Sequence, residues 1–262
     1  MRISPITYTS RIHNVVAQKQ NNVKDIYNNI PAQKPDCVSF SGKKINPKRV
    51  ILILGAPNSG KGTFARKISE QYLIPQISTG DILRKEVNQG TQLGKQAKNY
   101  MEQGSLVPDE LIMKIFKNRI SQTDCKNGFI LDGFPRTIKQ AKQLDEILRR
   151  YKNINLKILN LDVDKSILYA RSAARYTCKD CSKTYSIQQG CNPKTLRCDC
   201  GGSLIKRTDD TPEVLTQRLE NYDKQTFPLL EYYGDKVSNI EIRGHDLPVD
   251  VTFAKLIEKL EK

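Results

Sequence analysis

Residues 51–63, with the sequence ILILGAPNSGKGT, constrain the fold of this 262-residue chain more than any other segment. Residues 50–54 form a continuous aliphatic run, which is typical of a strand buried on both faces. Residues 55–61 follow with the spacing G-x-x-x-x-G-K, and residues 63–72 have the pattern of a helix. This order predicts a phosphate cradle, because unpaired N–H groups and the positive end of the helix dipole face an anion there. The alternative is a chance glycine-rich turn.

The position after the lysine departs from the general motif. Gly62 stands where Ser or Thr ordinarily binds magnesium, and Thr63 comes one residue later. Magnesium is therefore expected elsewhere, and Asp132 in the segment LDGFPR directly follows a predicted strand. Arg136 in the same segment has the bidentate side chain that suits a phosphate. The alternative is a simple turn in which Asp132 caps the next helix.

Strands and helices alternate along the chain from about residue 49 onward. Repeated β–α units predict an α/β fold, a three-layer sandwich with a parallel five-stranded sheet covered by helices on both faces. The alternation breaks between residues 175 and 210. The predicted strands are 50–54, 74–78, 128–131, 156–161 and 240–242; the predicted helices are 63–72, 81–101 with glycine interruptions, 109–121, 137–151, 164–174, 211–222 and 249–260.

Residues 1–47 have a different composition from the rest of the chain. They are rich in Asn, Gln, Lys and Ser, and residues 1–49 carry nine basic side chains against two acidic ones. We expect a disordered basic extension with a short helix near residues 15–27, serving as a solvated tail or interaction arm. A cleavable organelle presequence is the alternative. No apolar run in the chain approaches the ~20 residues that a membrane span needs.

Four of the seven cysteines fall within 23 residues, in the region where the alternation breaks. The pairs Cys178-x-x-Cys181 and Cys198-x-Cys200 are separated by a stretch of hairpin length. Paired thiolates with this spacing predict a tetrahedral structural zinc site in a reducing compartment. Disulfides or unligated thiols are the alternatives.

Five separated motifs together resemble those of adenylate kinases, in order and in spacing. They are GAPNSGKGT at residues 55–63, STGDILR at 78–84, LVPDELI at 106–112, LDGFPR at 131–136 and RTDD at 207–210. The resemblance covers residues 48–262 and is closest to the long bacterial type with a zinc lid. It implies an acceptor-binding insert at 78–107, a lid at 175–210, and the reaction ATP + AMP ⇌ 2 ADP with Mg²⁺.

The resemblance also implies roles for individual residues. The implied catalytic residues are Lys61, Asp132, Arg136, Arg175, Arg207 and Arg218. The implied ATP-binding residues are Gly55, Ala56, Pro57, Asn58, Ser59, Gly60, Lys61, Gly62, Thr63, Arg171, Arg207 and His245. The implied AMP-binding residues are Thr79, Gly80, Arg84, Ser105, Leu106, Val107, Gly133, Phe134, Pro135, Arg136, Gln140 and Arg218. Many arginines are expected, because phosphoryl transfer depends on positioning and charge neutralisation.

Two features depart from the family pattern. Asn58 stands where glycine is usual, although Asn tolerates positive φ better than most residues. The second cysteine pair is one residue shorter than the C-x-x-C of the family's zinc lids, which leaves the role of Cys200 as fourth ligand open. The resemblance further implies a cytoplasmic monomer whose partners are ATP, AMP and ADP.

Other functions remain to be weighed against this one. The nearest alternatives are another nucleoside monophosphate kinase, a kinase that uses GTP as donor, and a regulatory nucleotide binder without activity. The net charge of +15 and the paired cysteines suggest a nucleic-acid-binding protein as a different class. The cysteine-bearing insert lacks a stripe of interleaved basic and aromatic residues, which disfavours that class.

Overall fold

The computed structural model describes residues 48–151, 153–187, 196–243 and 248–262. The predictions for residues 1–47 and for His245 lie outside the described residues, as does Cys191 of the lid. Among the helices that are described, none combines the length and the apolar character that crossing a bilayer requires.

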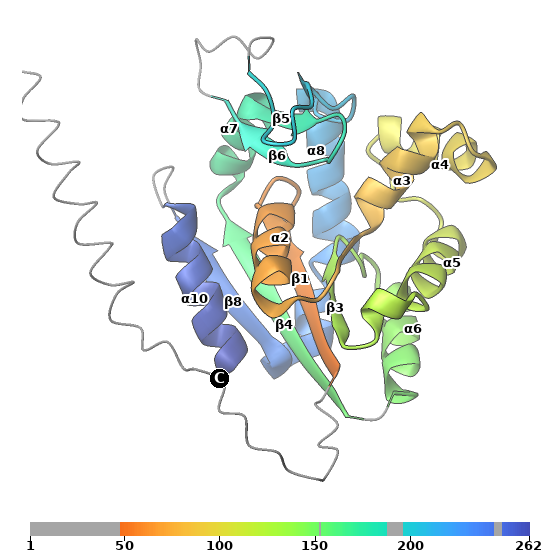
Figure 1. Ribbon diagram of the computed structural model, residues 1–262, viewed down its shortest axis with the longest axis vertical. Helices are drawn as coiled ribbons and strands as arrows, with labels where there is room; N and C mark the ends of the chain where they lie inside the picture. Colours follow the sequence, from red (N-terminus) through yellow and green to blue (C-terminus); the bar gives the residue numbers. More distant parts are fainter. Residues whose placement is uncertain (1–47, 152, 188–195, 244–247) are drawn as a thin grey trace, which may run out of the picture. The chain divides into compact units, whose positions relative to one another are not determined.

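A five-stranded parallel sheet forms the centre of the domain, as predicted (Figure 1). Its strands lie in the order β2-β3-β1-β4-β8, so consecutive strands are joined by crossover connections. The strand bounds are β1 (Lys48–Gly55), β2 (Gln76–Ser78), β3 (Gly128–Asp132), β4 (Ile154–Val163) and β8 (Val237–Ile242). Because all the strands run in one direction, Gly55, Ser78 and Asp132 meet at the same edge of the sheet.

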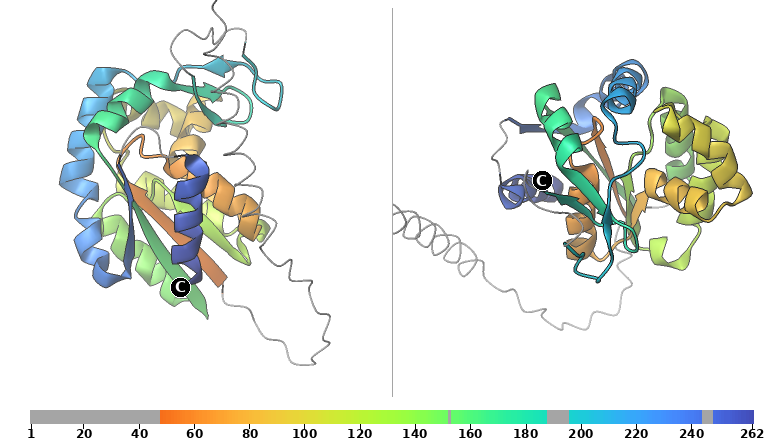
Figure 2. Two further views of the ribbon diagram at one scale, coloured as in Figure 1. Left: turned by 90° about the vertical axis from the view of Figure 1, so that its left-hand side faces the viewer. Right: turned by 90° about the horizontal axis from the view of Figure 1, so that it is seen from above.

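The two faces of the sheet carry two separate hydrophobic cores. Alternate residues of β1 point in opposite directions: Val50 and Leu52 pack into one core, and Ile51 and Ile53 into the other. All four side chains are no more than 1% exposed. The three-layer α/β sandwich expected from the sequence is therefore confirmed, and Figure 2 shows helices on both sides of the sheet.

Each core is closed by its own set of helices. One face is covered by α3, α4, α5, α6 and α9, and the other by α2, α7, α8 and α10. The helix bounds are α2 (Lys61–Tyr72), α3 (Thr79–Asn88), α4 (Gln92–Glu102), α5 (Asp109–Ile120), α6 (Ile138–Arg149), α7 (Lys165–Ala174), α8 (Pro212–Asn221), α9 (Leu229–Tyr233) and α10 (Val249–Glu261).

Two stretches differ from the predicted helices. The helical stretch predicted over residues 81–101 is divided into α3 and α4 at Gly90, which has φ +65°, and Thr91 caps the second helix by accepting a hydrogen bond from the N–H of Gly94. After α8 the backbone forms a π-helical turn, Tyr222–Thr226, before α9 begins beyond Pro228. Neither the turn nor α9 was predicted, because α9 has only five residues and the turn has no periodic pattern of its own.

The region where the alternation breaks forms a small second sheet. Three antiparallel strands lie in the order β6-β5-β7, with bounds β5 (Arg175–Cys178), β6 (Thr184–Ser186) and β7 (Leu204–Ile205). Helix α7 leads directly into β5, and Figure 1 shows this sheet beside the N-terminal end of α2.

Candidate active site

The loop from Gly55 to Gly60 joins β1 to the N-terminus of α2. Gly60 is the N-cap residue of α2 and offers no side-chain hydrogen bond to the first turn. The N–H groups at this helix end therefore remain available to an anion, which the helix dipole also favours. Asn58 adopts φ +65° within the loop, and its Nδ2 donates to the carbonyl oxygen of Leu168 on α7 at 3.4 Å.

Lys61 lies folded against this loop. Its Nζ donates hydrogen bonds to the carbonyl oxygens of Gly55 at 2.8 Å and Ala56 at 2.7 Å. Burial, together with the nearby Arg136 and Arg218, lowers the pKa of Lys61 to about 7, against the opposing effect of Asp132. The Asp132 carboxylate offsets only part of the burial cost of this cation, and a bound phosphate would relieve the rest.

Asp132 ends β3 and faces the beginning of α2. Its side chain is 8% exposed, and the Nε2 of Gln76 on β2 donates to its Oδ2 at 2.9 Å. Burial raises the pKa of Asp132, and Lys61 opposes that shift. A Cβ placed on Gly62 would lie 3.3 Å from Asp132 Oδ2, so the carboxylate occupies the space beside Gly62. A serine or threonine at position 62 would therefore crowd this carboxylate.

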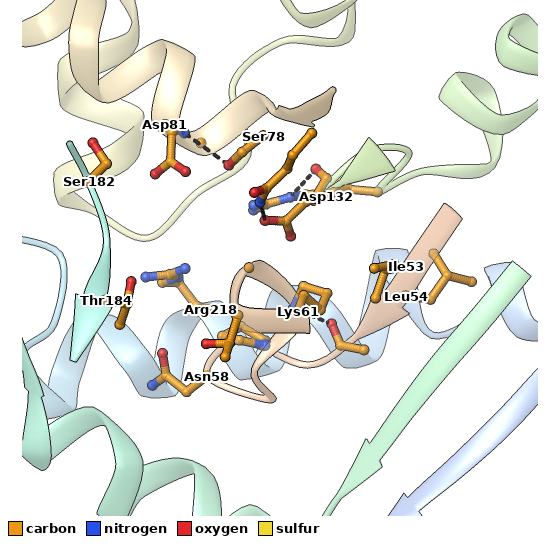
Figure 3. Close-up of a pocket in the computed structure, with 18 of the residues that line it drawn as sticks. Ile53, Leu54, Asn58, Lys61, Ser78, Asp81, Asp132, Ser182, Thr184 and Arg218 are labelled. Atoms are coloured by element: carbon orange, nitrogen blue, oxygen red, sulfur yellow. Dashed lines mark hydrogen bonds between the residues drawn. The ribbon is translucent and has the colours of Figure 1, made fainter. Parts of the chain in front are cut away.

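Arginines from several separate elements converge on one cavity of about 360 Å³. Figure 3 shows Lys61 and Arg218 on one side of this cavity and Ser78, Asp81 and Asp132 on the other. Ser182, in the turn before β6, and Thr184, the first residue of β6, also line the cavity. The predicted arginines that line the cavity are Arg84 of α3, Arg136 after β3, Arg175 of β5, Arg207 after β7, and Arg218 of α8.

Acidic side chains hold three of these arginines in place. Arg175 donates from Nε to Asp210 Oδ2 at 2.8 Å, and Arg218 donates from Nη1 to Asp209 Oδ2 at 3.0 Å. Asp209 also lies 3.6 Å from Arg84, which belongs to the acceptor insert.

The positive charge in the cavity exceeds what these acids neutralise. Burial, together with the neighbouring arginines, lowers the pKa of both Arg207 and Arg218 to about 10. An enclosed site with this charge favours a ligand with several negative charges.

A second cavity of about 60 Å³ shares lining residues with the first and lies between α3, α5, the loop after β3 and α8. Thr79, Ser105, Val107 and Gln140 line it, together with the apolar side chain of Leu83. Gln140 is only 2% exposed, and its amide is hydrogen-bonded to the protein on both atoms. The sequence gave no sign of these partners.

The structure brings most of the predicted site residues to these two cavities. From the loop, Gly55, Pro57, Asn58, Gly62 and Thr63 line the larger one along with Lys61; Gly80, Leu106, Gly133 and Pro135 line it from the acceptor side. Ala56, Ser59 and Gly60 shape the loop without lining either cavity.

Two further predicted residues line neither cavity. Phe134 is fully buried and stacks on Phe116 with ring centroids 4.6 Å apart, so it packs in the core rather than against a ligand. Arg171 lines neither cavity and donates from Nη1 to the carbonyl oxygen of Ser59 at 3.0 Å.

The four clustered cysteines form a compact group in the lid. The Sγ atoms of Cys178, Cys181, Cys198 and Cys200 all lie within 4.8 Å of one another. All four are free cysteines; Cys178 Sγ lies 3.5 Å from Cys200 Sγ, and Cys181 Sγ lies 3.4 Å from Cys198 Sγ. Four thiolates at ~2.3 Å from a tetrahedral zinc lie about 3.8 Å apart, so the shortened C-x-C spacing still fits that ion.

A phosphate loop, a buried lysine, converging arginines and a lid define a phosphoryl-transfer enzyme of the P-loop type. The family model for adenylate kinase matches residues 53–238, which is more than half of the chain. An adenylate kinase of Alkaliphilus oremlandii is 46% identical over 80% of this chain and 97% of its own length. Adenylate kinases of Clostridium tetani and Clostridioides difficile are 51% and 47% identical, over 71% and 80% of this chain and 87% and 97% of their own lengths. The chain belongs to the adenylate kinase family.

Proposed function

We propose that this protein transfers the γ-phosphoryl group of ATP, bound with Mg²⁺, to AMP and yields two molecules of ADP. The convergence of the phosphate loop with arginines of the core, the acceptor insert and the lid on one cavity carries this proposal. In the reaction the bond from the γ-phosphorus to the β–γ bridging oxygen breaks. A phosphate oxygen of AMP forms the new bond, and because that oxygen is already ionised no general base is required.

The donor triphosphate binds on the loop and the N-terminus of α2. Lys61 leaves the carbonyl oxygens of Gly55 and Ala56 and neutralises the outer phosphates. Arg175 and Arg207 approach the same phosphates from the lid, and Arg171 supports the loop through its hydrogen bond to the carbonyl oxygen of Ser59. Charge neutralisation by groups that are already in place lowers the barrier without reorganising solvent.

The low pKa of Lys61 predicts that donor binding takes up a proton above neutral pH. The folded-state pKa of about 7 lies below the ordinary value of 10.5, so the ligand-free protein holds Lys61 largely neutral at pH 8. The bound triphosphate favours the ammonium form and raises the pKa again. We expect uptake of up to about one proton per ATP at pH 8 and almost none at pH 6. Calorimetry in buffers of different ionisation enthalpy measures this uptake.

The Lys61→Met variant is the control for proton uptake, since ATP itself also titrates near neutral pH. Equal uptake by wild type and variant at pH 8 would contradict the assignment. The same shift affects stability: between pH 7 and 10.5 the unfolded chain binds more protons at this lysine than the folded one. The contribution of Lys61 to the free energy of unfolding therefore rises with pH in that window.

The acceptor nucleotide binds between α3, the loop after β3 and α8. Arg84, Arg136 and Arg218 hold its phosphate and the phosphoryl group in transfer. Thr79, Gly80 and Gln140 contact the base, and residues 105–107 contact the base and ribose. The Asp132 carboxylate would hold Mg²⁺, directly or through water, and the ion would supply further charge neutralisation on the transferred group. Closure of the lid excludes water that would otherwise accept the phosphoryl group.

A panel of acceptors and donors tests the proposed reaction. With ATP and Mg²⁺, we expect AMP to be phosphorylated with a kcat/KM at least a hundredfold above those of UMP, CMP and GMP, because only adenine presents the matching base edge. GTP in place of ATP tests donor choice. Comparable rates with a pyrimidine monophosphate, or activity with GTP alone, would assign the protein to another kinase of this class.

We also propose that the four lid thiolates bind one structural zinc ion. Four protein ligands leave no open position on a tetrahedral metal, so this ion stabilises the lid and takes no part in the chemistry. The hydroxyl of Tyr185 donates to Cys198 Sγ at 3.1 Å, as an outer hydrogen bond to a metal-bound thiolate does. Reduced thiolates of this kind suit the cytoplasm, where we expect the enzyme to act as a monomer.

Elemental analysis tests the zinc site and the role of Cys200 in particular. We expect one zinc per wild-type chain after dialysis, and less than a tenth of that in Cys200→Ser, because a neutral hydroxyl replaces a thiolate. Cys125→Ser is the matched control, since Cys125 lies outside the cluster beside Arg119. Equal zinc in Cys200→Ser and Cys125→Ser would exclude Cys200 as a ligand.

A further inference from the structure

We infer that Asp109 is a positioning residue that sets which base the acceptor site takes, by fixing the orientation of the Gln140 amide. This inference rests on the role proposed above for Gln140. A glutamine amide has an acceptor end and a donor end, and rotation by half a turn exchanges them without changing the shape of the site. What decides the orientation is therefore the polarity of the groups around it.

Both neighbours of the Gln140 amide have a single polarity. The backbone N–H of Arg136 donates to Gln140 Oε1, with N and O 2.7 Å apart. Nε2 of Gln140 donates to Asp109 Oδ1 at 2.6 Å. A backbone N–H can only donate and a carboxylate can only accept, so the opposite orientation would place two donors and two acceptors against each other. With Gln140 only 2% exposed, water cannot relieve that mismatch.

Each of these neighbours is itself held in place. Asp109 is the first residue of α5, where the helix dipole favours a negative charge, and its Oδ2 accepts from the Thr137 hydroxyl at 3.1 Å. That hydroxyl in turn accepts from the backbone N–H of Gln140 and so caps α6. The carbonyl oxygen of Arg136 accepts from the Thr226 hydroxyl at 2.9 Å. The amide is thus fixed between two helix ends and a loop.

The fixed amide leaves one N–H on Nε2 and one lone pair on Oε1 for a ligand in the smaller cavity. Adenine offers a donor at its amino group and an acceptor at N1, which this order can match. Hypoxanthine offers the reverse, an acceptor at O6 and a donor at N1. Since the arginines hold the phosphate and so orient the nucleotide, a hypoxanthine base cannot simply turn over to recover the match.

The experiment compares AMP with inosine monophosphate as acceptors, using ATP and Mg²⁺ and the full-length protein. We expect Asp109→Ala to lower the ratio of kcat/KM for AMP to kcat/KM for inosine monophosphate roughly tenfold, the size of one buried hydrogen bond. Most of the change is expected in KM. Asp109→Asn restores one acceptor oxygen and is expected to recover part of the ratio. A general loss of stability would lower both rates and leave the ratio unchanged.

Glu110→Ala is the matched control, because Glu110 lies in the same first turn of α5 and is exposed. It removes the same charge and should leave the ratio as in wild type. The inference would be overturned if Glu110→Ala changed the ratio as much as Asp109→Ala does. It would also be overturned if Asp109→Ala left the ratio unchanged.

Gln140→Leu separates this inference from the proposed base site. If the inference holds, Gln140→Leu lowers the ratio and the double variant with Asp109→Ala lowers it no further. If Gln140→Leu lowers the ratio but the two effects add in the double variant, the role of Asp109 is overturned and the proposed base site stands. An unchanged ratio in Gln140→Leu would overturn the proposed base site as well.

Discussion

Replacing Lys61 with methionine is expected to lower kcat about a thousandfold, which corresponds to about 4 kcal/mol of transition-state stabilisation. Lys61 is the cation that lies directly against the phosphate loop, with Nζ 2.7 Å from the Ala56 carbonyl oxygen. Methionine keeps the length and the apolar stem of the side chain but removes the charge. Steady-state kinetics with saturating ATP and AMP measure the loss.

The same variant should keep or gain thermal stability when no nucleotide is bound. Burial lowers the pKa of Lys61 to about 7, which means that the folded protein disfavours its charge. Removing the amine therefore relieves a desolvation cost rather than an attractive interaction. A variant with wild-type kcat would show that the loop does not hold the transferred phosphates. A variant that is inactive because it is unfolded would be revealed by its melting curve.

Gly128→Ala is expected to destabilise the domain by about 3–5 kcal/mol, because the added methyl group meets the backbone of the neighbouring strand. Gly128 begins β3 with φ +135°, a conformation that L-residues rarely adopt. A Cβ at this position would lie 2.0 Å from the carbonyl oxygen of Arg49 on β1, the strand paired with β3. The Arg49 carbonyl group and the backbone of Gly128 both belong to the paired strands β1 and β3, so neither can move aside at low cost. Differential scanning calorimetry should show a Tm lowered by roughly 10 °C or more.

Gly90→Ala provides the comparison for this effect. Gly90 also has a positive φ, +65°, but no atom lies within 4 Å of the added Cβ. Its cost is therefore the left-handed conformation alone, roughly 1–2 kcal/mol. If both variants lose the same free energy of unfolding, the contact with the Arg49 carbonyl oxygen adds nothing to the cost of the Gly128 substitution.

The sequence predicted the sheet and the phosphate end of the site because both are encoded locally. The aliphatic run of β1 requires burial on both faces, and the glycine spacing after it requires a loop at a helix N-terminus. The same reasoning placed Asp132 beside the loop, since parallel strands end at one edge of the sheet. The sequence could not predict that the short C-x-C pair still places its sulfur atoms at distances that suit zinc. Those distances depend on the geometry of the turn that joins the two cysteines.

The supporting partners of the site could not be predicted in this way. Gln76, which holds one oxygen of Asp132, looks in the sequence like any polar residue of a short strand. Asp109 looks like an ordinary first-turn acid, and its contact with Gln140 joins residues 31 positions apart. Phe134 was assigned to the acceptor site by its motif, yet its ring packs against Phe116. Such contacts depend on how helices pack over the sheet, which periodicity and motif spacing do not determine.

A double-label transfer experiment tests the central claim most directly. ATP carrying radioactive phosphorus at its γ position is incubated with Mg²⁺ and AMP that carries tritium in its base, and the nucleotides are then separated. The two-cavity site predicts ADP that contains both labels, two ADP formed for each ATP consumed, and little labelled inorganic phosphate. Labelled phosphate released without doubly labelled ADP would contradict the account, because the protein would then hydrolyse ATP and not transfer its phosphoryl group to AMP.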